Sequence, residues 1–286
     1  MKKKVYLAFT AEILNRGHIN ILNKASKFGE ITIGLLTDKA ISSYKKIPYL
    51  NYKQREIIIK NLKMVKKVVP QNTLDYRPNL KKYKPDYVVH GDDWKKGILK
   101  NTRKQVISEL KKWSGKLVEI PYTKDINSLK NENKNFYYEK NRDNRTSLLK
   151  RLLDAKKLTR VVEAHSPLSA LIAERIQIKK KNKFVEFDGF WSSSLTDSLL
   201  RGKPDNQSVD LNIRITALSE ILDITSKPII FDADNGGRIE HLPFTINSME
   251  RQGISAIVLE DKVGLKKNSL FSNVISLINK KVGQQR

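Results

Sequence analysis

The chain has 286 residues, of which 39% are hydrophobic, 8% aromatic and 30% charged. This length allows one large domain or two of ordinary size, and the apolar content excludes global disorder. No apolar run approaches the roughly 20 residues that span a bilayer, so we expect a cytoplasmic protein without a membrane partner. The absence of cysteine excludes disulfides, thiolate metal sites and cysteine nucleophiles.

The net charge of +25 is concentrated in the first half of the chain. Residues 1–149 carry 33 Lys and Arg against 14 Asp and Glu, a net charge of +19, whereas residues 150–286 have a net charge of +6. Such a field attracts phosphates on nucleotides or on nucleic acid. The lysines are scattered and no base-stacking repeat accompanies them, so we expect small-molecule substrates and keep a basic nucleic-acid-binding protein as an alternative.

The first half alternates β-branched runs with amphipathic stretches, the βαβ pattern of a parallel sheet covered by helices. Strands are predicted at residues 5–9, 30–36, 65–69, 86–90 and 116–120, and helices at 18–28, 52–62 and 102–113. The segment between the first strand and the first helix favours a phosphate through its backbone N–H groups. There Gly17 lets the backbone approach a ligand, and His18 can donate to an α-phosphate, although a Gly-His pair at a helix start is also ordinary structure.

A polar stretch at residues 127–145 is interpreted as a linker, after which the alternation restarts. Strands are predicted at 160–164, 186–190, 228–231 and 256–260, and helices at 167–176, 208–222 and 240–252. Four βα units are therefore expected, whereas a closed barrel of eight typically needs roughly 250 residues. The second half is expected to be an open sheet or an incomplete barrel.

Three motifs follow later strands of the first half: Thr37-Asp38 with the lysines and arginine after it, Gly91-Asp92-Asp93-Trp94, and residues 121–128. With these motifs, residues 1–128 resemble the cytidylyltransferase family that includes glycerol-3-phosphate cytidylyltransferase. The resemblance implies a Rossmann-like nucleotidyltransferase domain. It also implies attack of a phosphate or phosphonate oxygen on the α-phosphorus of CTP, with Mg²⁺ carried by the nucleotide.

By this resemblance, His18 matches the second His of the family's H-x-G-H motif and is the catalytic residue. Asn15 stands where the first His belongs, and because an amide cannot carry positive charge, turnover is expected to be weaker or the acceptor different. The implied nucleotide-binding residues are Asn15, Gly17, Lys46, Arg55, Asp92, Trp94 and Thr123.

In the second half, Asp232 and Asp234 end one predicted strand and Glu260 ends the next. Carboxylates placed in this way can bind a hard cation, although an ordinary turn through residues 235–237 is the plainer interpretation. The stretch 259–269 (LEDKVGLKKNS), with DGFWSSS at 188–194 and RGKPD at 201–205, looks like phosphoenolpyruvate mutase of the isocitrate lyase superfamily. The resemblance runs from about residue 147 to 271, and implies part of a TIM-type (β/α) barrel.

On this match, Asp232 binds Mg²⁺ directly, whereas Asp234 and Glu260 hold its water shell. Trp191 and Ser193 would bind the substrate carboxylate, and Asp205 would lie beside the transferring group. A gating loop would carry Lys266, Asn268 and Ser269. The catalytic ones are Asp205, Lys266 and Asn268, and Ser269 binds substrate. The implied reaction moves the phosphoryl group of phosphoenolpyruvate from oxygen to carbon.

These resemblances predict a nucleotide-binding domain at 1–128, a linker at 129–146 and the first half of a barrel at 147–286. They imply a bifunctional protein of phosphonate biosynthesis that uses Mg²⁺ and CTP. Alternatives are a chain in which only the transferase is active, and a phosphonopyruvate hydrolase. Lyase chemistry is disfavoured because this chain lacks the gating-loop cysteine of the superfamily's lyases. A homo-oligomer or a complementing chain could complete the barrel.

Overall fold

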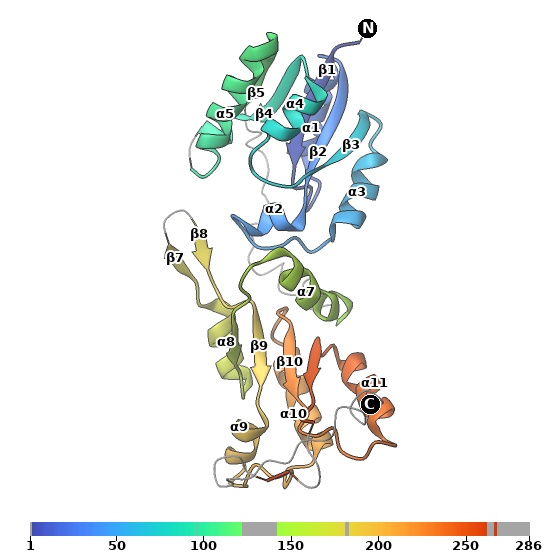
Figure 1. Ribbon diagram of the computed structural model, residues 1–286, viewed down its shortest axis with the longest axis vertical. Coiled ribbons are helices and arrows are strands. Elements are labelled where there is room, and N and C mark those ends of the chain that lie inside the picture. Colours follow the sequence, from blue (N-terminus) through green and yellow to red (C-terminus); the bar gives the residue numbers. More distant parts are fainter. Residues whose placement is uncertain (1, 96, 122–141, 181–182, 262–265, 268–286) are drawn as a thin grey trace. The chain divides into compact units, whose positions relative to one another are not determined.

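The computed structural model describes residues 2–95, 97–121, 142–180, 183–261 and 266–267. The chain divides into two compact units, one formed mainly by residues 1–131 and the other mainly by residues 132–286. We call them the N-terminal unit and the C-terminal unit and describe each by itself (Figure 1).

The N-terminal unit is built on a five-stranded parallel sheet with the order β3-β2-β1-β4-β5. Its strands are β1 (Lys4–Phe9), β2 (Glu30–Leu36), β3 (Val65–Gln71), β4 (Tyr87–Gly91) and β5 (Lys116–Ile120). Its helices are α1 (Arg16–Ser26), α2 (Asp38–Ser42), α3 (Tyr52–Lys60), α4 (Arg77–Tyr83) and α5 (Lys100–Leu110), with 3₁₀ turns at Asp92–Lys95 and Lys111–Trp113. This order is that of a doubly wound Rossmann-like sheet, and it leaves a crevice between the ends of β1 and β4.

Both faces of this sheet are covered, because successive side chains of a strand point to opposite faces. Val5, Leu7 and Phe9 of β1 join one apolar cluster with Leu22 of α1. Tyr6 joins a second cluster that includes residues of α4 and α5. The nearly continuous apolar sequence of β1 is therefore explained by burial on both faces.

The C-terminal unit contains a four-stranded parallel sheet with the order β11-β10-β9-β6. Its strands are β6 (Val161–Glu163), β9 (Gly189–Ser192), β10 (Ile229–Asp232) and β11 (Ala256–Val258). The helices are α7 (Arg142–Ala155), α8 (Pro167–Arg175), α9 (Ser194–Leu199), α10 (Leu211–Leu222) and α11 (Leu242–Gln252). A separate two-stranded sheet pairs β7 (Ile178–Lys180) with β8 (Lys183–Val185), and residues 179–184 are grouped with the N-terminal unit. Each new strand of the main sheet adds beside the previous one. This is the winding of a TIM-type barrel, and the sheet is not closed within the described residues.

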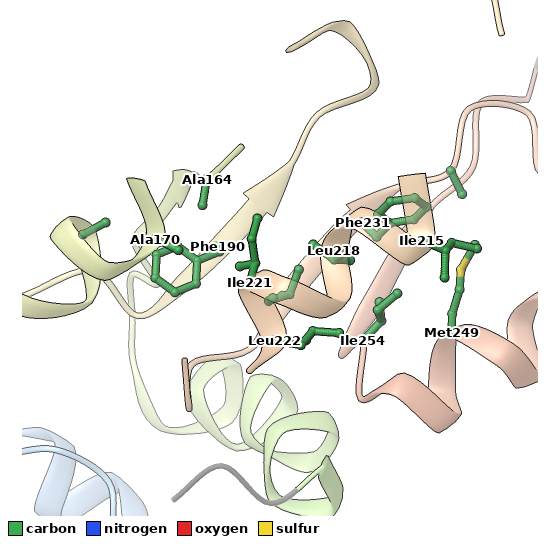
Figure 2. Packing of buried hydrophobic residues seen from close by; sticks show 13 residues of the cluster. Ala164, Ala170, Phe190, Ile215, Leu218, Ile221, Leu222, Phe231, Met249 and Ile254 are labelled. Carbon is green, nitrogen blue, oxygen red and sulfur yellow. The ribbon is translucent and has the colours of Figure 1, made fainter. Parts of the chain in front are cut away.

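One apolar cluster joins the strands and helices of the C-terminal unit. Figure 2 shows Phe190 of β9 and Phe231 of β10 with Leu218 and Ile221 of α10 and Met249 of α11. These positions follow the expected periods, alternating along β10 and recurring every three or four residues along α10.

The predicted strands and helices are present, with bounds that differ by up to three residues, whereas α2, α4, α7, α9, β7 and β8 were not predicted. Helix α7 begins at Arg142, inside the stretch 129–146 that was expected to be a linker. The second strand predicted in this half was expected at 186–190, but β9 begins at Gly189 and ends at Ser192. The described helices include none that is long and apolar enough to cross a membrane.

Candidate functional site

A pocket of about 280 Å³ lies at the carboxyl ends of β1 and β4 in the N-terminal unit. This is the position where open α/β sheets bind ligands, because the chain leaves adjacent strands in opposite directions there. Its lining includes Thr10 after β1, Asn15, Gly17 and His18 at the start of α1, and His90, Gly91 and Asp93 at the end of β4. The structure thus brings together three of the residues predicted to bind or act on a nucleotide.

Asn15 and His18 are joined by reciprocal hydrogen bonds at the beginning of α1. The Asn15 side chain accepts from the backbone N–H of His18 at 3.1 Å, and Nδ1 of His18 accepts from the backbone N–H of Asn15 at 3.3 Å. This capping box satisfies two N–H groups that the helix itself cannot pair. Asn15 therefore has a structural use, as the residue that starts α1.

The same hydrogen bonds determine how His18 can act. Burial lowers the pKa of His18, and the positive charge of Lys45 lowers it further. The ring is therefore neutral near pH 7, and because Nδ1 accepts a hydrogen bond, the proton is on Nε2. His18 can donate this Nε2–H to an oxygen of a phosphate at the start of α1.

Arg55 was predicted to contact the nucleotide, but it is fully buried and does not line the pocket as the described residues form it. Its guanidinium donates to the carbonyls of Thr10 at 2.6 Å, Leu36 at 2.9 Å and Leu50 at 3.1 Å, and it pairs with Asp38 at 2.8 Å. Buried carbonyls at strand ends need such donors. Arg55 therefore holds the ends of β1 and β2 in place behind the pocket.

Three further predicted nucleotide-binding residues, Lys46, Asp92 and Trp94, also lie off the described pocket lining. Trp94 is 1% exposed, because its ring is stacked under His90 with centroids 3.8 Å apart and planes at 1°. Thr123 lies outside the described residues.

Sequence analysis missed His90 and two tyrosines of the pocket, Tyr44 and Tyr76, whereas Asp93 belongs to the Gly91-Asp92-Asp93-Trp94 motif that it singled out. Burial raises the pKa of Tyr44 to about 12, so its hydroxyl stays protonated. The sequence does contain an indication for His90. It is the one histidine in the apolar strand that precedes the Gly91-Asp92-Asp93-Trp94 motif, and a polar ring at the end of such a strand is a candidate site residue.

In the C-terminal unit, a cluster of charged side chains lies where β9 and β10 end. Ser194, the first residue of α9, donates to Oδ2 of Asp232 through its backbone N–H at 3.2 Å and its hydroxyl at 2.8 Å. Oδ1 of Asp232 accepts from the backbone N–H of Asp234 at 3.1 Å. Asp234 adopts a left-handed backbone with φ of 54°, and this tight turn directs its N–H back toward Asp232.

Arg214 of α10 is buried in this cluster and connects two acids. Its Nη1 lies 2.9 Å from Oδ2 of Asp234 and its Nε lies 2.9 Å from Oδ2 of Asp197. Its guanidinium carbon lies 4.7 Å from the centroid of the Phe231 ring. Sequence analysis missed Arg214, although a charge in line with Leu218 and Ile221 on the apolar face of a helix indicates a buried ion pair.

Lys266 was predicted to lie on a gating loop, and its ammonium is buried in the same cluster. It donates to the Ser194 hydroxyl at 2.7 Å, to Oδ1 of Asp205 at 2.8 Å, and to Oδ1 of Asp234. Burial alone lowers the pKa of Lys266, but its hydrogen bonds to Asp205 and Asp234 outweigh burial and raise the pKa above its ordinary value. Lys266 is therefore a protonated cation held by two carboxylates.

In this arrangement donors of the chain itself contact the predicted Mg²⁺ ligands. Both carboxylate oxygens of Asp232 and both of Asp234 accept hydrogen bonds from the chain's own donors. Glu260 is joined to Asp234 through its backbone N–H, which donates to the Asp234 carbonyl at 2.6 Å. Across the described ranges no three His, Asp or Glu side chains converge as metal ligands. The cations that this cluster holds are the ammonium of Lys266 and the guanidinium of Arg214.

The remaining predicted substrate residues lie near the same strand ends. Trp191 is in β9, beside Glu163 of β6 and Ile230 of β10, and Ser193 is the N-cap position of α9. Asn268 and Ser269 lie outside the described residues.

Comparison with known proteins identifies the N-terminal half. Residues 10–152, half of the chain, match the family model described as cytidylyltransferase-like. The glycerol-3-phosphate cytidylyltransferase of Bacillus spizizenii is 30% identical over 95 residues, which cover 32% of this chain and 74% of that protein. The chain belongs to the cytidylyltransferase-like family. The predicted Rossmann-like nucleotidyltransferase fold of this half is confirmed.

The C-terminal half matches a second enzyme family. Residues 149–282 match the family model described as phosphoenolpyruvate phosphomutase. The phosphoenolpyruvate phosphomutase of Tetrahymena pyriformis is 31% identical over 130 residues, covering 45% of this chain and 40% of that protein. The phosphonopyruvate hydrolase of Variovorax sp. (strain Pal2) is 31% identical over 123 residues, covering 43% and 39%. The chain thus spans about two fifths of the length of these two relatives.

Proposed function

We propose that the N-terminal unit transfers a cytidylyl group from CTP to a phosphate or phosphonate. An oxygen of the acceptor attacks the α-phosphorus, a new P–O bond forms, and the bond to the β-phosphate breaks to release pyrophosphate. CTP enters as its Mg²⁺ complex, which is a substrate. The observation that carries the proposal is the pocket at the ends of β1 and β4, with the Nε2–H of His18 available beside the first turn of α1.

His18 supports this reaction through the protonation state that its surroundings impose. A neutral ring donating from Nε2 can stabilise negative charge that builds on the α-phosphate as the leaving group departs. The backbone N–H groups of the first turn add to this stabilisation. Asn15 keeps the ring in position through the capping box, so the reaction needs only one histidine in this motif.

Release of pyrophosphate from CTP tests this function, with glycerol 3-phosphate and 2-hydroxyethylphosphonate as acceptors. We expect His18→Ala to lower the rate by a factor of about 10² or more, in the range for loss of one transition-state donor. His165→Ala is the matched control, because His165 is an exposed residue of the C-terminal unit. Absence of pyrophosphate release with both acceptors, together with no CTP binding by calorimetry, would contradict the proposal.

For the C-terminal unit we propose chemistry on phosphoenolpyruvate or phosphonopyruvate, in phosphonate metabolism. The match of residues 149–282 to the phosphoenolpyruvate phosphomutase model and the 31% identity to both relatives support this proposal. Asp205, Asp232, Asp234 and Lys266 lie together where β9 and β10 end, the position of the site in barrel enzymes. Mutase and hydrolase activities are both compatible with its relatives. Phosphorus NMR with phosphonopyruvate and Mg²⁺ distinguishes them, because a mutase yields phosphoenolpyruvate and a hydrolase yields inorganic phosphate. An unchanged phosphonopyruvate signal would contradict both.

A further inference from the structure

His90 lies in the same pocket as His18 but has no part in the proposed transfer step. Its Nδ1 is 2.8 Å from the carbonyl oxygen of Gly91. A carbonyl can only accept a hydrogen bond, so Nδ1 must carry a proton. His90 is therefore in the opposite tautomer to His18, whose Nδ1 accepts.

The ring of His90 is held rigidly in this orientation. Trp94 stacks against one of its faces, and the Trp94 Nε1–H donates to Oε1 of Glu119 at 2.8 Å. Arg103 in turn holds both carboxylate oxygens of Glu119, at 2.8 and 3.0 Å. Because Glu119 is the partner of His90 in the pairing of β4 with β5, this chain of contacts supports the ring from the adjacent strand. Rotation of the ring would break the bond to Gly91 and the stacking on Trp94.

The atom of His90 left for a ligand is Nε2. The side chain is 12% exposed and lines the pocket, and within the described ranges Nε2 has no hydrogen-bond partner. Burial lowers the pKa of His90, although the hydrogen bond to Gly91 opposes this, so the ring is neutral near pH 7. With the proton on Nδ1, Nε2 presents a lone pair and acts as an acceptor.

The surroundings of His90 favour a ligand that donates hydrogen bonds. The carboxylate of Asp93 is a second acceptor on the same part of the pocket, 3.7 Å from Nδ1 of His90. No lysine or arginine is among the described residues that line the pocket. The amino group at position 4 of cytosine is a donor that fits such acceptors. Uracil presents a carbonyl oxygen at this position, which would leave Nε2 facing another acceptor.

We propose that His90 is a specificity-determining residue that accepts a hydrogen bond from the exocyclic amino group of the base, so that CTP is bound in preference to UTP. This inference rests on the proposed nucleotidyltransferase function. A buried site built to pair a polar group discriminates strongly against an analogue that lacks it, because its own polar atom is then left unpaired.

Calorimetric titration of the full chain with CTP and with UTP tests the inference. We expect CTP to bind at least about tenfold more tightly to the unaltered protein, in keeping with the loss of one buried hydrogen bond. His90→Leu removes the acceptor and keeps an apolar contact with Trp94, so the ratio should fall close to one, mainly through weaker CTP binding. His165→Ala should keep the original ratio.

A change in the ligand gives a test that needs no variant. N4,N4-dimethyl-CTP lacks the amino donors, and we expect it to bind the unaltered protein at least about tenfold more weakly than CTP. Three results would each overturn the role of His90 while leaving nucleotide binding intact. They are equal binding of CTP and UTP, an unchanged ratio of CTP to UTP affinity in a folded His90→Leu variant, and equal binding of CTP and the dimethyl analogue. Failure of the unaltered protein to bind any of these nucleotides would overturn the proposed function and this inference together.

Discussion

Replacement of Arg214 by leucine should destabilise the C-terminal unit more than any exposed charge substitution. Arg214 is 1% exposed and is the common partner of Asp197 and Asp234. Leucine preserves apolar contact with Phe231 and leaves two carboxylates without this cation. Removal of one partner from a buried ion pair typically costs about 3–5 kcal/mol, most of it the penalty of the charge left behind.

The geometry places the expected loss near the lower end of that range, at about 3 kcal/mol. Asp234 keeps Lys266 as a partner after the substitution, so its carboxylate is still compensated. Among the cations that the structure describes, Asp197 keeps only Arg201, at 4.0 Å, and it therefore carries most of the penalty. Asp197→Asn in the same chain should then recover at least about 1 kcal/mol, because it removes the uncompensated charge.

Hydrogen exchange with mass spectrometry during urea titration measures this loss, read from peptides that cover β10 and α10. A local readout is needed because a chain of two units need not unfold in one step. Arg175→Leu on α8 is the matched control, since Arg175 is exposed, and it should cost less than about 1 kcal/mol. An Arg214→Leu variant as stable as the Arg175→Leu variant would refute the buried ion-pair network.

Two further predictions concern charges in the separate units. Lys266→Met leaves Asp205 and Asp234 without their ammonium, so we expect Mn²⁺ or Mg²⁺ to bind about tenfold or more tightly. Calorimetry and Mn²⁺ electron paramagnetic resonance measure this affinity. Weaker binding of the metal would show that Lys266 does not stand in for a cation. In the N-terminal unit, the pKa of Glu119 is lowered from 4.5 to about 2, mainly by its hydrogen bond to Arg103. The ionised Glu119 carboxylate therefore stabilises the fold above pH 4.5, and this stabilisation is lost as the pH falls from about 4.5 to about 2. Glu119→Gln should remove this part of the acid dependence of the urea midpoint, and an unchanged acid limb would contradict it.

The strands of the N-terminal unit could be predicted from sequence because each is a short apolar run ended by turn residues. Residues 30–36 and 116–120 were predicted as strands, and β2 and β5 have these bounds. Helix α1 was expected to begin at residue 18 and begins at Arg16, because Asn15 caps it through a bond to a residue three positions later. The role of Arg55 could not be predicted from sequence, because its three carbonyl partners come from segments up to 45 residues away in the chain.

The charged cluster of the C-terminal unit shows which contacts of strand-end carboxylates a local sequence pattern does not predict. Asp232 and Asp234 were correctly expected to be near one another, since they are two residues apart. Their partners, however, come from α9, from α10 and from Lys266, and no local pattern relates these segments. Two cations from the chain therefore contact the oxygens of Asp234, which sequence reasoning had placed in the water shell of Mg²⁺. The positive charges of Arg214 and Lys266 oppose a divalent ion at Asp234, which is why the response of metal affinity to Lys266→Met tests whether the ammonium stands in for a metal.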